Sequence, residues 1–363
     1  MRLKKGPPDF ILFITVVALL GMGLIMVFSS SAYTTFVQYG DDYYYFKKQL
    51  MWAIMGICAL IVLMKLNYLK IKDLAIPLIV VAVVCLILVI PLGTEAKGAV
   101  RSLGIGAIRF SPSELAKLAM VLFLAKTMEI NMANIKSFSK GILPYIVLLA
   151  LICGLIMQQP DLGTSFVVAA TIFFMLLIAG ARWSHLAAIA LSGMAAVAAA
   201  IAVAPYRMER FVAFLDPWKY ARDEGFQTIQ SLYALGSGGL FGMGLGMSRQ
   251  KFFYLPEQHT DFIFAILGEE LGFIGVFVVL ALFLLFAWRG FRIAIKAPDT
   301  FGSLLAAGIT TMIVFQAAIN IAVVAGALPV TGITLPFISY GGTSLLFTLA
   351  AVGLLLNISR YSN

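Results

Sequence analysis

Five carboxylates stand within or beside long apolar runs, and they are the residues from which chemistry is expected: Glu114, Asp161, Asp261, Glu269 and Glu270. An ionised group at membrane depth is costly, so each of these acids is expected either to pair inside the protein or to serve a function. A carboxylate held in such surroundings can act as a general base toward a substrate hydroxyl. The sequence around each acid indicates which role suits it.

Asp261 follows a polar segment and precedes a long apolar one, in YLPEQHTDFIFAILGEELGF (254–273). One interpretation is structural: Thr260 caps a helix, and Asp261 lies in the first turn, where the helix dipole favours a negative charge. The other is catalytic, with Asp261 as a base at the outer mouth of that helix. The neighbouring His259 is expected to be an interfacial residue or a substrate contact rather than a catalyst.

The other acids have structural explanations too. Glu114 and Lys117 are three residues apart, so they can pair on one face of a helix that starts at Pro112 or Ser113. Asp161 lies in the tight turn QQPDLGT (158–164), where aspartate is common. Contact with a substrate remains open for all three residues. Glu269 and Glu270 are adjacent and cannot share a helix face, so at least one needs a partner on another helix or must be neutral.

Two familiar kinds of catalytic centre are unsupported. The sequence has no His-x-x-x-His pair, no cluster of cysteine and histidine, and no G-x-S-x-G motif. We therefore expect neither a dedicated zinc site nor a serine-hydrolase triad. No metal ligands are assigned from the sequence.

The elements that must position these residues are membrane helices. Apolar residues make up 61% of the 363 residues and charged residues 12%, against about 25% charged in a typical soluble domain. Because a hydrocarbon core needs about 20 apolar residues per helix, we predict an all-α polytopic membrane protein, a single transmembrane domain over residues 1–363. Ten spans are expected, at 10–28, 50–64, 74–92, 113–126, 142–157, 164–181, 186–204, 262–288, 303–328 and 344–357.

An even number of spans places both termini on one side. Alternate short connections carry lysine and arginine residues: Lys65, Lys70, Lys72, Lys126, Lys136, Lys140, Arg289, Arg292 and Lys296. By the positive-inside rule these connections and both termini are expected to be cytoplasmic. The net charge of +9 therefore does not call for a nucleic-acid partner.

Two connections on the opposite side break this rule. The connection 93–112 carries Lys97, Arg101 and Arg109, and the long extracytoplasmic loop 205–260 carries Arg207, Arg210 and several other basic residues. These charges favour an anionic ligand on the outer face. The same loop contains the glycine-rich run SLYALGSGGLFGMGLG (231–246), which is expected either to cradle phosphate or to lie irregularly at the membrane interface.

Five blocks of the sequence, in order, cover nearly the whole chain. They are GAVRSLGIGAIRFSPSELAKLA (98–119), QQPDLGT (158–164), APYRMERFVAFLDPW (204–218), GFQTIQSLYALGSGGLFGMGLGMSRQKFFYLPEQHTDFIFAILGEELG (225–272) and LPVTGITLPFISYGGTSL (328–345). Together they resemble the SEDS family, the shape, elongation, division and sporulation proteins. The segment SRQKFFYLPE (248–257) is similar to the division and sporulation branch, FtsW-like, and the chain's ending is closest to the stage V sporulation protein E type.

The resemblance implies a fold, an activity and partners. It implies ten transmembrane helices and a peptidoglycan glycosyltransferase that polymerises lipid II for cell division or spore cortex synthesis. It also implies association with a class B penicillin-binding protein transpeptidase, within the divisome or the sporulation cell-wall machinery. The essential aspartate of the family falls on Asp261. Further family positions fall on Arg109, Glu114, Lys117 and Asp161, while Ser102 and Ser111 depart from the usual Trp and Gln.

The chemistry of lipid II agrees with this inventory. Its pyrophosphate leaving group is already a stable anion, so it needs positive charge rather than a proton donor, and one base suffices for the incoming hydroxyl. We expect Arg109, Arg207 and Arg210 to bind the pyrophosphates and Asp261 to be the base. No cofactor is required, although a divalent cation (Mg²⁺ or Mn²⁺) could join Asp261 to the pyrophosphate. Two other interpretations remain open: a lipid II flippase, and a non-catalytic scaffold for the penicillin-binding protein.

Overall fold

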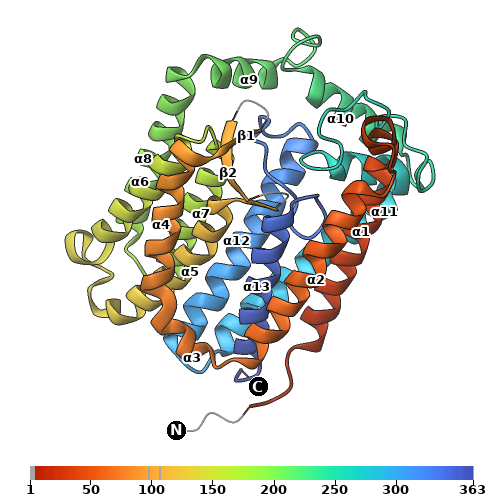
Figure 1. Cartoon of the computed structure of the whole chain (residues 1–363). Coiled ribbons are helices and arrows are strands. Elements are labelled where there is room, and N and C mark those ends of the chain that lie inside the picture. Colours follow the sequence, from red (N-terminus) through yellow and green to blue (C-terminus); the bar gives the residue numbers. More distant parts are fainter. Residues whose placement is uncertain (1–4, 97–98, 106–107, 363) are drawn as a thin grey trace.

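The computed structural model describes residues 5–96, 99–105 and 108–362, and each of the ten expected spans lies on a helix (Figure 1). These helices are α1 (Phe10–Tyr39), α2 (Tyr44–Lys65), α4 (Ala75–Leu92), α5 (Pro112–Ile130), α6 (Leu143–Met157), α7 (Leu162–Ile178), α8 (Trp183–Val203), α11 (Ile263–Lys296), α12 (Thr300–Val324) and α13 (Gly342–Ser359). The prediction of a polytopic helical membrane protein is confirmed.

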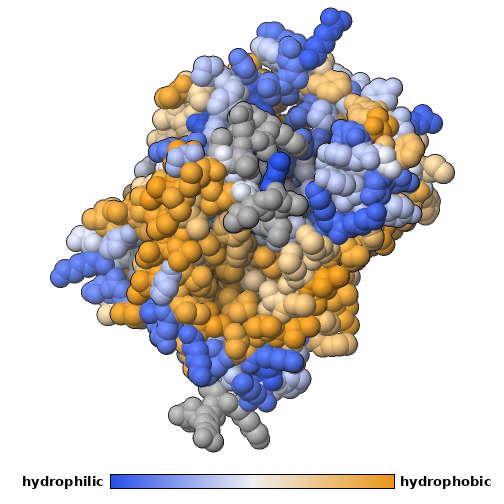
Figure 2. Space-filling view, viewed as in Figure 1, coloured by the Kyte–Doolittle hydropathy of each residue, from blue (hydrophilic) through white to orange (hydrophobic). Residues whose placement is uncertain are grey.

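Length and composition distinguish two of these ten helices from the rest. In the described ranges, eight helical segments are long and apolar enough to cross a membrane by these criteria, with α6 counted together with the turn before it as Phe138–Met157. Helix α7 is shorter, with 17 residues. Helix α5 has 19 residues but carries four charged ones. The space-filling view shows an apolar belt around the middle of the molecule with hydrophilic residues at both ends (Figure 2). The chain is therefore a multi-pass membrane protein.

The remaining elements lie at the two ends of the bundle. One end, here called the terminal end, has the short turns α3 (Tyr68–Ile71), η1 (Lys72–Leu74), η2 (Met132–Asn134) and the π-helical η3 (Phe138–Ile142). The other, here called the sheet end, has α9 (Pro205–Leu215), α10 (Phe226–Ser237) and three short strands (Figure 1). The strands β1 (Thr94–Ala96), β2 (Ala99–Ile105) and β3 (Ile108–Phe110) form an antiparallel sheet in the order β1-β2-β3. No strand was expected in this connection.

The two C-terminal helices form the centre of the bundle. About three quarters of the membrane-spanning parts of α12 and α13 are buried, and they pack against α2, α5, α7 and α11. Helix α8 is the opposite case, since only 6% of its span is buried. The core that holds the cavities described below is therefore built mainly by the last two helices.

The described ends of the chain meet at the terminal end. The Gly6 amide donates to the Arg360 carbonyl at 2.7 Å, and the Asp9 carboxylate pairs with Arg289 of α11. Asp9 also accepts a hydrogen bond from the Leu12 amide, so it caps α1. The described ends of the chain thus lie at the same end of the bundle. That this side is cytoplasmic remains a prediction.

Helix α11 is interrupted where a single continuous span was expected. Gly272 has φ 64° and ψ −165°, a backbone conformation that is essentially restricted to glycine. The glycine-rich run packs its backbone directly on this break: a Cβ on Gly272 would stand 2.2 Å from the Gly242 nitrogen. The Met243 and Gly244 amides donate to the carbonyls of residues 269 and 270. Gly238 and Gly242 of this run thus permit close backbone packing on α11, which favours a structural role over the phosphate-cradle interpretation.

The adjacent acids just before this break are both satisfied by hydrogen bonds. Glu270 accepts from the Ser29 hydroxyl of α1 and from Lys251, whose Nζ lies 2.9 Å from Oε1. Glu269 accepts from the hydroxyl of Ser248 and from the Arg249 amide at 3.0 Å. The prediction that at least one acid needs a partner on another helix is confirmed. Lys251 is buried in this network and pairs with an acid of the protein itself.

Gly272→Ala should destabilise the protein strongly, since an added methyl group meets both an unfavourable φ and the backbone of Gly242. We expect the free energy of unfolding to fall by at least about 2 kcal/mol, measured by denaturation in detergent. The matched control is Gly236→Ala in α10, where nothing lies within 4 Å of an added Cβ. That change should be neutral or stabilising by about 0.5–1 kcal/mol. Equal stability of the two variants would contradict this account of the break.

Candidate functional site

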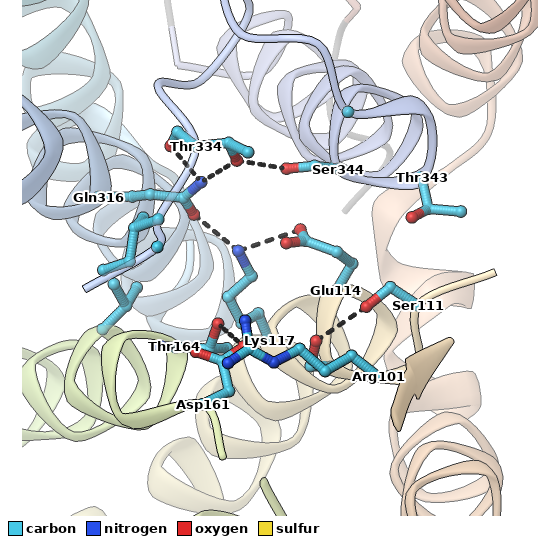
Figure 3. Close-up of a pocket in the computed structure, with 15 residues that line it drawn as sticks. Arg101, Ser111, Glu114, Lys117, Asp161, Thr164, Gln316, Thr334, Thr343 and Ser344 are labelled. Atoms are coloured by element: carbon cyan, nitrogen blue, oxygen red, sulfur yellow. Dashed lines mark hydrogen bonds and ion pairs between the residues drawn. The ribbon is translucent and has the colours of Figure 1, made fainter. Parts of the chain in front are cut away.

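Two adjoining cavities open at the sheet end of the bundle. The large cavity, about 500 Å³, is lined by Arg101, Tyr206, Arg207, Arg210, Phe211, Glu257, Thr260, Asp261 and Thr331 among others. The small cavity, about 200 Å³, is lined by Arg101, Ser111, Ser113, Glu114, Lys117, Asp161, Thr164, Gln316, Thr343 and Ser344 among others (Figure 3). Arg101, Gly332 and Thr334 belong to both linings, so the two cavities share a wall.

The fold brings these residues together because several helices begin at the same level. The first turns of α5, α7 and α13 supply most of the small cavity, and the segment before α11 supplies part of the large one. The loop 325–341 between α12 and α13 runs between them and forms the shared wall. Residues far apart in sequence therefore converge at one place.

Asp261 lies in the large cavity and does not cap a helix. Helix α11 begins at Ile263, and its cap residue Phe262 makes no side-chain capping bond. The Thr260 hydroxyl donates instead to Glu257, at 2.7 Å from Oε2. The helix-start interpretation of Thr260 and Asp261 is thus wrong, because α11 begins only at Ile263 and both residues precede its cap residue Phe262.

The backbone around Asp261 is locked to the loop 325–341. The Nδ2 amide of buried Asn320, on α12, donates to the carbonyls of both Asp261 and Ile333, each at 2.7 Å. The Ser339 hydroxyl donates to the carbonyl of Thr260 at 2.6 Å. A Cβ on Gly332 would lie 3.6 Å from Asp261 Oδ2 and 3.8 Å from Arg101 Nη1. The carboxylate and the guanidinium therefore face the same small space, which a larger residue at position 332 would fill.

Arg101 was not among the arginines that the sequence predicted to bind the pyrophosphates. It projects from β2, and its guanidinium donates to the carbonyls of Gln159 at 2.9 Å and Pro160 at 2.6 Å. Arg109 had been preferred, but it is exposed on β3 and lies outside the linings of both cavities. The register of the sheet separates the two arginines, and no sequence signal showed that register. Lys97 lies outside the described residues.

Arg109 lies instead near an aromatic cluster. Burial raises the pKa of Tyr340 to about 12, while the positive charge of Arg109 acts in the opposite direction. The His259 ring stacks on Tyr45 with 4.5 Å between ring centroids, and its backbone carbonyl accepts from the Tyr340 amide. His259 is therefore part of the packing beside Asp261 and is not among the residues that line either cavity.

Arg207 and Arg210 reach the large cavity from α9, which crosses the sheet end above the bundle (Figure 1). Three residues apart on a helix, they lie on one face with Tyr206 and Phe211. Arg207 donates to the carbonyl of Ala200 at 3.0 Å, which ties α9 to the end of α8. The placement of both arginines beside Asp261 agrees with the expected role, which is argued further below.

The small cavity is organised by a buried lysine. Lys117 Nζ lies 3.0 Å from Glu114 Oε2 and donates to Gln316 Oε1 at 2.6 Å (Figure 3). Gln316 in turn connects Lys117 to the loop 325–341, since its Nε2 donates to the Thr334 carbonyl at 3.0 Å. The predicted pairing within α5 is confirmed. Gln316 is an additional partner, on α12, that the sequence did not reveal.

Asp161 combines the two roles that had been left open. Its carboxylate accepts from the amide and the hydroxyl of Thr164, at 2.9 and 2.8 Å, so it caps α7. This is the turn chemistry expected from QQPDLGT. The same residue lines the small cavity, so a structural position and contact with a ligand are compatible.

The two cavities differ in charge. Among the described residues, the lining of the large cavity has three arginines against the carboxylates of Glu257 and Asp261, so the lining carries one net positive charge. Arg210 also pairs with Glu224, which lies outside the lining, at 3.1 Å. The small cavity has Arg101 and Lys117 against Glu114 and Asp161, so its charges balance. Within the described part of the chain, no three side chains of His, Cys, Asp or Glu form a group able to hold a metal ion alone. The large cavity can therefore bind an anion next to a carboxylate.

Lys117→Ala should leave the half-buried Glu114 carboxylate without its buried cation. Breaking a buried pair costs about 3–5 kcal/mol, so we expect lower stability and lower abundance, measured by unfolding in detergent. Lys126→Ala, further along α5, is the control. The Glu114→Ala, Lys117→Ala double variant should recover part of the loss, because no charge is then left unpaired. A Lys117→Ala protein as stable as the control would mean that the pair has no structural role.

Comparisons with known proteins agree with this geometry. The model of a protein family described as cell cycle protein, covering FtsW, RodA and SpoVE, matches residues 10–363. Stage V sporulation protein E of Bacillus subtilis (strain 168) is 49% identical over 364 residues, which is all of both chains. The probable peptidoglycan glycosyltransferase FtsW of Trichlorobacter lovleyi is 42% identical, over 97% of this chain and 93% of that one.

A solved structure shares the fold. It comes from work on the structural coordination of polymerization and crosslinking by a peptidoglycan synthase complex. It superposes with a TM-score of 0.80 at 32% identity, over 97% of this chain and 98% of that chain. The arrangement of helices around the two cavities is thus shared with a protein of that complex.

Proposed function

The chain belongs to the FtsW, RodA and SpoVE family of cell cycle proteins and is a peptidoglycan glycosyltransferase, and we propose that it polymerises lipid II with Asp261 as general base. The observation that carries the proposal is the placement of Asp261 in one cavity with three arginines. A base and an anion site side by side are what glycosyl transfer from a pyrophosphate requires.

The reaction follows from this arrangement. The acceptor hydroxyl oxygen forms a bond to the anomeric carbon of the donor sugar, while the bond from that carbon to the pyrophosphate oxygen breaks. The hydroxyl proton passes to the Asp261 carboxylate, and undecaprenyl pyrophosphate leaves. No acid is needed for the leaving group, because positive side chains stabilise its charge. This need separates the enzyme from glycosidases, which use two carboxylates.

Arg101, Arg207 and Arg210 supply that positive charge. Each lines the large cavity, and guanidinium groups bind phosphate oxygens in a bidentate manner that lysine cannot reproduce. Arg109 was expected in this role and lies elsewhere. Arg101 takes its place, because it is fixed by two backbone carbonyls and faces Asp261 across Gly332.

A divalent cation fits the same cavity. Mg²⁺ is commonly bound by one or two carboxylates together with substrate phosphates, and Glu257 and Asp261 both line the large cavity. These two residues would hold Mg²⁺ or Mn²⁺, and the ion would supply further charge stabilisation for the pyrophosphate. The structure of the site does not depend on it, since the arginines are held by protein groups.

The partner and the orientation follow from the family and from charge. The solved relative belongs to a complex that couples polymerization to crosslinking. The partner proposed for this chain is accordingly a class B penicillin-binding protein transpeptidase, within the division or sporulation cell-wall machinery. The sheet end faces outward and both termini face the cytoplasm, because the lysine-rich short connections gather at the terminal end.

Asp261→Asn should abolish most glycan polymerisation by the purified protein supplied with lipid II. Asparagine keeps the shape but cannot take a proton, and loss of a general base costs about 10²- to 10⁴-fold in rate. Binding of lipid II and of the penicillin-binding protein should be retained. Near-normal polymerisation by this variant would end the assignment of Asp261.

The same assay separates the alternative functions. A flippase would move lipid II across vesicles while neither the wild type nor the variant forms polymer. A scaffold would do neither and would only bind its partner. Polymer from the wild-type protein alone excludes both alternatives as its main function.

Arg207→Lys and Arg101→Lys should each weaken the use of lipid II although the charge is kept, because the bidentate contact is lost. We expect KM for lipid II to rise about 5- to 20-fold. Arg109→Lys serves as the matched control, as Arg109 lies outside both cavities. If the Arg109 variant were impaired and the other two were normal, the choice among the arginines would be reversed.

A further inference from the structure

The small cavity has hydrogen-bonding capacity that the protein itself does not use. Lys117 has three N–H groups, of which Glu114 and Gln316 occupy two. The carboxylate of Asp161 uses one lone pair on each oxygen. The Thr343 hydroxyl makes no hydrogen bond to the other lining residues (Figure 3). Donors and acceptors are therefore both left over, at positions spread around the cavity.

The balance of charge indicates the class of ligand. The large cavity carries more cations than anions and suits a pyrophosphate, whereas the charges of the small cavity cancel. A neutral ligand that both donates and accepts is matched by this mixture. Sugar hydroxyl groups have this property, since each has one donor and two acceptor positions.

Size and position narrow the choice further. A volume of about 200 Å³ corresponds to six or seven water molecules at roughly 30 Å³ each. That space is of the size of a single sugar ring, and a ring that carries a peptide would have to extend out of it. The shared wall contains Gly332, and Asp261 lies beside it. A hydroxyl on a ring in the small cavity can therefore approach the proposed base.

We propose that the small cavity is the subsite for an uncharged, unbranched sugar ring of lipid II, the ring whose hydroxyl Asp261 deprotonates. The proposal rests on the proposed function and assigns the pyrophosphate of the donor and the sugar of the acceptor, which belong to two different molecules, to two cavities. Pyrophosphate binds in the large cavity by charge, and the acceptor sugar binds in the small cavity by hydrogen bonds. Arg101, common to both linings, holds their relative position.

The test compares lipid II with undecaprenyl pyrophosphate, which lacks the sugars and the peptide that one of them carries. Binding of lipid II and of undecaprenyl pyrophosphate is measured for the full-length protein in nanodiscs. The principal variant combines Ser113→Ala with Thr343→Val, which removes two hydroxyls that line the small cavity alone. Arg207→Ala removes a cation of the large cavity alone, and Thr348→Val is a matched buried change elsewhere on α13.

The proposal predicts a selective effect. With undecaprenyl pyrophosphate saturating the large cavity, the double variant should bind lipid II about tenfold more weakly than the wild type does. Its affinity for undecaprenyl pyrophosphate should be unchanged, which also shows that it is folded. Arg207→Ala should weaken the binding of undecaprenyl pyrophosphate, and Thr348→Val should weaken the binding of neither ligand. If the double variant proves unstable, Thr343→Val alone should give a smaller selective loss. The kcat/KM for polymerisation should fall in step with the affinity for lipid II.

Other results would overturn it. Unchanged binding of both ligands would mean that the small cavity holds only water. Equal loss of both ligands would mean that the hydroxyls support the large cavity instead. A wild-type protein that binds lipid II without polymerising it would defeat the proposed function, and the comparison of ligands would still test the sugar subsite.

Discussion

Within the hydrocarbon region of a membrane, no water is available to form hydrogen bonds with a polar group that the protein leaves unpaired. This constraint explains why the buried polar side chains of this protein pair with one another. Glu270 meets Lys251 and Ser29, and Glu114 meets Lys117. The contacts of Glu270 join α11 to α1 and to the segment that carries Lys251, whereas the pair of Glu114 and Lys117 lies within α5. Buried pairs of this kind give specificity of arrangement more readily than stability. In this bundle they fix where the outer segments sit on the helices.

The break in α11 shows how one such arrangement supports the site. Gly272 allows the helix to bend, and the glycine-rich run packs against the bend. Glu269 and Glu270 bind the segment that follows the glycine-rich run, through the Arg249 amide and the Lys251 side chain. Asp261 stands at the other end of the short helical piece that this clamp secures. Asn320 then fixes the Asp261 backbone to the loop 325–341. The position of one carboxylate thus depends on contacts spread over α1, α11 and α12.

Two cavities with different charge fit a substrate that is itself divided. Lipid II joins an anionic pyrophosphate to neutral sugars, and a single uniform pocket could not favour both by the same interaction. Here the arginines gather on one side of Gly332, and the hydroxyls and balanced charges on the other. Because the arginines and Asn320 are held in place by protein groups, little reorganisation is needed when substrate binds. The same preorganisation would bring the acceptor hydroxyl close to its base.

The sequence by itself determined the membrane class, the positions of the ten helices, the pairing of Glu114 with Lys117 and the turn role of Asp161, because all of these depend on composition or on spacing along one helix. It also identified Asp261 as the candidate general base. Tertiary structure alone decided which arginine faces Asp261, since Arg101 and Arg109 are separated only by the register of a small sheet. Gln316, Asn320 and the packing of the glycine run were equally invisible, as each depends on segments distant in sequence meeting in space. Local sequence patterns reflect contacts within one segment, whereas the site is formed by contacts between segments that are distant in sequence.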